Sequence, residues 1–210
     1  MTTTAFRPLN LNSTAYGGVL IAATLVVLGL VAHHPPQWLL TPADAVAIAA
    51  DPMARIEHGI FILLTLVLMT GASGLAWRIG IAHPLVMAGW LTYVGGGMSL
   101  VLALLLNGYI TPALPKDALP PAVAVLAAIS RLGMILLSAG IVLWGHALLH
   151  RGGTARWMAL LGMATGGFSV AFVLTAGPEL DLDRLMGWAA AHVVWNLAVG
   201  TWFLRSLKRD

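Results

Sequence analysis

The chain of 210 residues contains no cysteine, which excludes disulfides, thiolate metal sites, covalent attachment of a c-type haem and cysteine nucleophiles. Its only lysines are Lys116, in a predicted loop, and Lys208, near the C-terminus, so a Schiff-base cofactor within the helices is also excluded. Neither a glycine-rich phosphate-binding loop nor an HExxH motif occurs. The common sequence signatures of cofactor chemistry are therefore missing.

Charge is scarce as well. Only 9% of the residues are charged and 59% are hydrophobic, whereas about a quarter of the residues in soluble domains are charged. The mean hydropathy is +0.89. This composition excludes an ordinary soluble domain and indicates an integral membrane protein.

Six continuous apolar stretches are each long enough, at about 20 residues, to cross a bilayer as a helix. The expected spans are residues 15–32, 53–77, 84–107, 130–149, 157–176 and 184–204. A short helix on the outer surface is expected near residues 42–50, where Thr41 and Asp44 frame a helix start. The sequence thus predicts one all-α domain over residues 1–210, a bundle of six transmembrane helices.

The basic residues predict an orientation. If the N-terminus is cytoplasmic, seven of the eleven lie on the cytoplasmic side: Arg7, Arg78, Arg151, Arg156, Arg205, Lys208 and Arg209. Four lie outside: Arg55, Lys116, Arg131 and Arg184. The positive-inside rule therefore places both termini in the cytoplasm, in a multi-pass protein of the inner (cytoplasmic) membrane.

The sequence pI of about 9.8 reflects this topology. No basic cluster or aromatic platform suited to nucleic acid occurs, so we expect no nucleic-acid partner. Membrane lipid is the partner that the composition implies.

The last apolar stretch has an unusual polar and aromatic face. At about 100° per residue, Trp188, His192 and Trp195 fall on one side of a helix, with Asn196 at its edge. Histidine and asparagine are costly in lipid, so this face should point at protein, a ligand or water. We expect it to face the helix over residues 53–77.

That helix carries a second histidine. Asp51 and Pro52 predict a sharp start, which puts His58 roughly 10 Å into the membrane, at a depth similar to that of His192. Arg131 should lie near the same outer boundary. The sequence therefore predicts a shared polar site toward the outer face, with six candidate residues: His58, Arg131, Trp188, His192, Trp195 and Asn196.

Three functional classes are compatible with such a site. In the first, His58 and His192 ligate a haem b or a metal ion, Trp188 and Trp195 flank the ring, and Arg131 pairs with a propionate. In the second, a small permease or binder of an apolar or weakly polar molecule uses the same polar residues, with Asn196, to line a cavity.

The third class is a non-catalytic membrane subunit or assembly protein of a larger complex, whose polar groups hold its helices together and whose aromatic residues face a protein partner. We favour this class. An enzyme is the least favoured interpretation, because no carboxylate lies deep in the membrane and no nucleophile accompanies His192.

Overall fold

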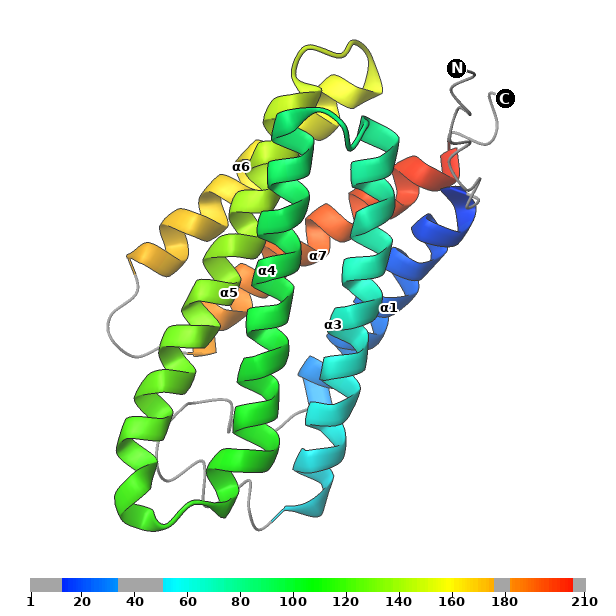
Figure 1. Ribbon diagram of the computed structural model, residues 1–210. Helices are drawn as coiled ribbons and strands as arrows, with labels where there is room; N and C mark the ends of the chain where they lie inside the picture. The colour runs from blue at the N-terminus through cyan, green and yellow to red at the C-terminus, as the bar shows by residue number, and fades with distance from the viewer. Residues whose placement is uncertain (1–12, 34–50, 176–181, 206–210) are drawn as a thin grey trace, which may run out of the picture.

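The computed structural model describes residues 13–33, 51–175 and 182–205, and the secondary structure of these ranges is entirely helical (Figure 1). The predicted all-α class is confirmed. The expected surface helix near residues 42–50 lies outside the described residues. The described ranges contain six long helices: α1 (Ser13–His33), α3 (Pro52–Ile79), α4 (Pro84–Leu105), α5 (Leu119–Leu148), α6 (Thr154–Leu174) and α7 (Leu182–Arg205).

A short irregular segment joins α4 to α5. It consists of the one-turn π-helix η1 (Leu106–Ile110) and two 3₁₀ turns, η2 (Thr111–Ala113) and η3 (Lys116–Ala118). We call the end of the molecule that contains this segment the η1 end. The opposite end holds Arg78, Arg151, Arg156 and Arg205, and we call it the arginine end.

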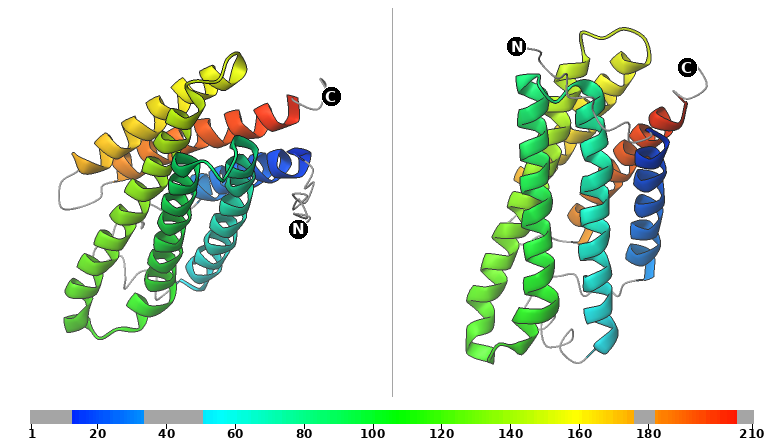
Figure 2. Two further views of the ribbon diagram at one scale, coloured as in Figure 1. Left: turned by 45° about the horizontal axis from the view of Figure 1, so that its top comes forward. Right: turned by 45° about the vertical axis from the view of Figure 1, so that its right-hand side comes forward.

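The long helices form a closed ring in chain order. Each packs against the next, and α7 packs against α1 to complete the circuit. Figures 1 and 2 show the ring as two layers, with α3, α4 and α5 in one and α6, α7 and α1 in the other. Buried side chains from all six helices, among them Leu20, Trp144, Trp195 and Phe203, fill the space between the layers.

Local signals set the helix ends. Asp51 caps α3, and its side-chain oxygen accepts a hydrogen bond of 2.9 Å from the backbone N–H of Met53. Pro52, Pro84 and Pro120 lie in the first turns of α3, α4 and α5, where a missing N–H costs nothing. Gly80 ends α3 with a φ of 108°, a left-handed conformation that glycine adopts without strain.

Four helical segments are long and apolar enough to cross a membrane: residues 52–79, 84–113, 116–148 and 154–174. The apolar part of α1, Ala15–Val31, would extend about 26 Å, slightly less than a hydrocarbon core of about 30 Å. In α7, the mean hydropathy is lowered by His192, Asn196 and the tryptophans. Membrane-spanning helices are thus supported for four segments, and the count of six stays a prediction.

Helix α5 is longer than the membrane crossing expected within it. The sequence limited the crossing to residues 130–149, whereas the structure has one continuous helix of 30 residues, about 45 Å long. Such a helix is longer than the hydrocarbon core is thick, so it must tilt or project at one end.

Glycine allows α4 and α5 to approach closely. A Cβ on Gly96 would lie 2.5 Å from the backbone nitrogen of Leu137 and 2.8 Å from the carbonyl oxygen of Gly133. A Cβ on the adjacent Gly95 would have no neighbour within 4 Å. The Gly96 contact fixes the register of α5 against α4 and turns the next residue, Ser138, toward the other layer.

We therefore expect Gly96→Ala to lower the free energy of unfolding by about 1–3 kcal/mol, because backbone atoms cannot move aside as a flexible side chain can. The matched change Gly95→Ala should be neutral or stabilise the protein by about 0.5–1 kcal/mol, since alanine favours a helix more than glycine does. Thermal or denaturant unfolding of both variants in detergent measures the difference. Equal stability of the two variants would contradict the close approach.

Candidate functional site

The candidate site of the last helix is built around one serine hydroxyl. Ser138 is fully buried on α5, and its Oγ lies 3.0 Å from Nε2 of His192 and 3.1 Å from Nε1 of Trp188, both on α7. The same hydroxyl donates to the carbonyl oxygen of Met134 at 2.7 Å. The rings of Trp188 and His192 lie in contact, with centroids 4.2 Å apart and planes tilted by 35°. One side chain thus joins the two layers.

This geometry fixes the tautomer of His192. A serine has a single hydroxyl hydrogen, and that of Ser138 goes to Met134, so the oxygen can only accept from the other two groups. The neutral His192 ring therefore carries its hydrogen on Nε2. The nitrogen that most often binds a metal is occupied by a donated hydrogen bond.

A second unit of the same kind lies between α3 and α4. Trp90 Nε1 donates to the Oγ of Ser73 at 2.9 Å, and Ser73 donates to the carbonyl oxygen of Met69 at 2.8 Å. In both units an indole N–H is satisfied by a serine that is itself anchored to its own helix. The repetition indicates that both units serve to join helices, because the Ser73 unit contains no group suited to catalysis or to binding a cofactor.

The other residues on the polar and aromatic face of α7 also point into the bundle. They do not face α3, the helix that the sequence predicted as their neighbour. Trp195 is buried against Gly162 of α6, and Asn196, one turn beyond His192, is buried as well. The expectation that this face meets α3 was wrong for its central part, which contacts α5 and α6. The ring order explains this, because α1 lies between α3 and α7.

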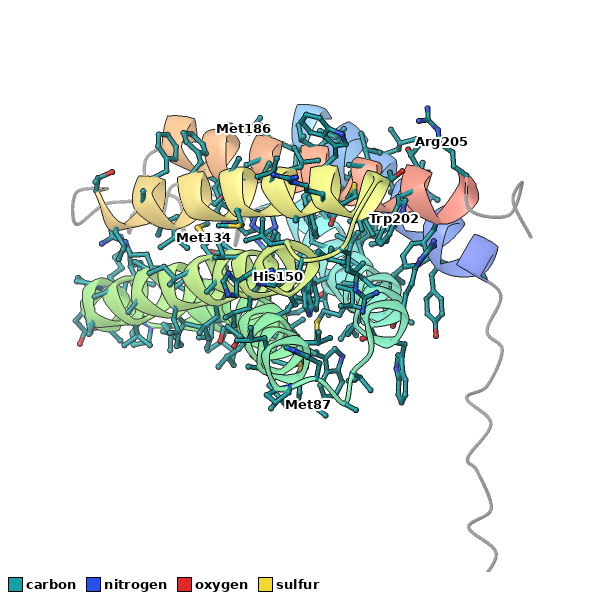
Figure 3. The ribbon with its side chains drawn as sticks, turned by 90° about the horizontal axis from the view of Figure 1, so that it is seen from above. Met87, Met134, His150, Met186, Trp202 and Arg205 are labelled. Carbon is teal, nitrogen blue, oxygen red and sulfur yellow. The ribbon has the colours of Figure 1, made fainter. Side chains whose placement is uncertain are left out.

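Helices α3 and α7 do meet at the arginine end. The guanidinium carbon of Arg78 lies 4.3 Å from the centroid of the Trp202 ring and 5.1 Å from that of Phe203. Figure 3 shows Trp202 on this side of α7, directed toward the layer of α3, α4 and α5. A cation over aromatic faces is stabilising, and more so where water is excluded.

His58 occupies a separate polar contact at the η1 end. It is buried on α3, its Nδ1–H donates to the carbonyl oxygen of Ala54 at 2.6 Å, and its Nε2 accepts from the side-chain amide of Asn107 at 3.0 Å. Asn107 lies in η1, and Gly108 beside it leaves room for the ring, since a Cβ there would lie 2.6 Å from that of His58. The π-helix thus positions the amide.

The structure does not bring the two histidines together. His58 packs at the level of Gly108, whereas His192 bonds to Ser138, next to Leu137 at the level of Gly96. From Gly96 to Gly108 the chain rises roughly 18 Å at about 1.5 Å per residue. One haem or metal ion held by both imidazoles does not fit this separation, and each ring already has a protein partner.

Arg131 is half-buried on α5, two turns before Ser138 on nearly the same helical face. It therefore shares the side of α5 that carries the Ser138 contact. Within the described ranges, no group of three His, Asp or Glu side chains is placed to hold a metal ion. Of the six predicted residues, Trp188 and His192 bond to one serine, and Trp195 and Asn196 continue the same buried face.

Several residues of these contacts were missed from the sequence. Ser138 and Ser73 look like ordinary small residues in apolar helices, and Asn107 looks like a loop residue. The pattern that could have indicated Ser138 is its spacing of seven from Arg131, which places the two on one face. Nothing in the sequence indicates that Asn107 would meet His58.

Comparisons with protein-family models, with curated proteins and with solved structures find no match to this chain. The class of the protein therefore rests on its own features. It is a helical protein with four segments able to cross a membrane, and with buried histidines that are bonded to neighbouring helices.

We predict that Ser138→Ala destabilises the protein by about 1–3 kcal/mol, because it leaves the buried Nε2 of His192 without its hydrogen-bond partner and leaves Trp188 with only its longer bond of 3.3 Å to the carbonyl oxygen of Met134. Ser169→Ala is the matched control. Ser169 is equally buried, but its Oγ makes no hydrogen bond within the described part of the chain, so removing it should be neutral or stabilising. Unfolding measurements in detergent test this order, and a reversed order would contradict it.

Proposed function

We propose that the protein is a six-helix, multi-pass protein of the inner (cytoplasmic) membrane, and that it acts as a non-catalytic subunit or assembly protein. One observation carries the proposal: the side chains that looked most like cofactor ligands are engaged in hydrogen bonds between helices. His192 bonds to α5 and His58 to η1. Their role is to hold the bundle in one arrangement.

The packing of α1 and α7 supports six crossings. The two helices run antiparallel in close contact, since a Cβ on Gly17 would lie 2.8 Å from the carbonyl oxygen of Gly200. A helix of α1's apolar character needs lipid or protein around it, and α7 buries His192 and Asn196 on its inward face. We place the arginine end in the cytoplasm, as the distribution of basic residues predicts.

The outer surface of α6 offers a place for a protein partner. Phe168 is exposed, and its ring stacks on that of Phe172 with centroids 5.0 Å apart. Aromatic pairs on the lipid-facing side of a helix supply a large, rigid contact area for another helix. We propose that this pair forms part of the interface with the partner subunit.

The absence of cysteine makes the topology directly testable, because every introduced thiol is unique. Ala15→Cys and Met53→Cys flank α1, and Thr175→Cys and Arg205→Cys flank α7. We expect an impermeant maleimide to label Met53→Cys and Thr175→Cys in intact spheroplasts, and the other two only after permeabilisation. Labelling of both members of either pair from one side would show that the helix between them does not cross.

Partner binding has its own test. Protein purified in mild detergent after brief crosslinking should contain a stoichiometric second protein, and Phe168→Ala should reduce its yield several-fold without changing thermal stability. Leu63→Ala, a comparably exposed apolar site on α3, is the control and should retain the partner. A clean monomer under all of these conditions would refute the subunit proposal.

A further inference from the structure

Three helix ends at the arginine end share one arrangement, a tryptophan within a turn of an arginine. Trp77 and Arg78 lie in the last turn of α3, Arg156 and Trp157 in the first turn of α6, and Trp202 precedes Arg205 in the last turn of α7. Figure 3, seen from this end, shows Trp202 and Arg205 near the end of α7, with Trp202 directed toward the layer of α3, α4 and α5.

Two of these tryptophans point outward. Trp157 is 74% exposed and Trp77 is 57% exposed. Each continues a lipid-facing stripe of its helix: Leu63, Leu66 and Val67 precede Trp77 on α3, and Leu160 and Phe168 follow Trp157 on α6. An exposed indole at the end of an apolar stripe marks the level of the lipid headgroups.

The charges at this level have one sign. Two arginines contact other parts of the protein: Arg78 lies over the Trp202 ring, and Arg151 donates to the carbonyl oxygen of Ile79. Arg156 and Arg205 are exposed. His146, in the last turn of α5, and His150, just after the helix, are exposed. Among the residues whose side chains the structure describes, Asp and Glu occur at the η1 end, and none occurs at the arginine end.

We propose that the arginine end binds the headgroups of anionic phospholipids in the adjacent leaflet, with Arg156 and Trp157 as the principal contacts. A guanidinium forms paired hydrogen bonds to phosphate, and the neighbouring indole packs against the glycerol and upper acyl region. Because no carboxylate of the described chain competes for Arg156, the surface is selective for lipids that carry net negative charge.

This inference rests on the membrane insertion of α3 and α6 and does not depend on the subunit role. Native mass spectrometry of the full-length protein tests it, with phosphatidylglycerol and phosphatidylcholine of identical acyl chains supplied at equal concentration in detergent. We expect several-fold more phosphatidylglycerol bound than phosphatidylcholine. Arg156→Gln should remove most of that preference, and Trp157→Leu should lower retention of both lipids.

Lys116→Gln is the control, since it removes the same charge from an exposed site at the η1 end. It should leave the preference unchanged, and all three variants should unfold at the temperature of the parent protein. Equal retention of the two lipids by the parent overturns the proposal, as does an equal loss in Lys116→Gln, which would mean that net charge alone is responsible. Displacement of phosphatidylglycerol by millimolar inorganic phosphate would also overturn it, by identifying a site for free anions.

Failure of this proposal and failure of the proposed function are distinguishable. Loss of lipid preference leaves the partner and the thiol labelling pattern as they are. Absence of a partner protein leaves the lipid preference intact.

Discussion

The pairing of buried N–H groups is the constraint on which the interior of this bundle depends. In a hydrocarbon environment, a side-chain donor without an acceptor costs far more than the same group in water. The Ser138 hydroxyl, which is anchored to its own helix through Met134, bonds to both Trp188 and His192, and Trp188 also donates to the carbonyl oxygen of Met134 at 3.3 Å. Since the three groups come from opposite layers, meeting this demand also fixes how the layers sit on each other.

Close contact between helix backbones lets the two layers approach near enough for these hydrogen bonds. Gly96 brings α4 against α5, Gly166 brings α6 against the carbonyl oxygen of Ser138, and Gly162 makes room for the Trp195 ring. Lipid provides little hydrophobic force between helices, so small residues and hydrogen bonds carry the association. The histidines of the candidate site make hydrogen bonds between helical segments in the same bundle that these glycines bring together.

The sequence was sufficient for the features that depend on local chemistry. Continuous apolar runs gave the helices, Asp51 and Pro52 gave the start of α3, and the cost of burying His192 and Asn196 predicted correctly that they face inward. The sequence could not predict which helices become neighbours. The prediction that His192 faces α3 and shares a level with His58 failed because position along a helix says nothing about ring order or tilt. Nor could the π-helical turn η1 be foreseen, although it contains the Asn107 that bonds to His58.

The closed ring has a consequence for the order in which the chain is made. Helix α1 is made before the other five long helices of the ring, yet one of its two neighbours is α7, which is made after them. Before α7 is made, the face of α1 that contains Gly17 lacks its packing partner. Ser138 of α5 likewise lacks its hydrogen bonds to Trp188 and His192. The bundle can grow stepwise from α3 to α6, but α1 and α7 can pack together only once α7 has been made. If translation stops before α7, the ring stays open between α6 and α1. The hydroxyl of Ser138 then has no hydrogen bond to Trp188 or His192.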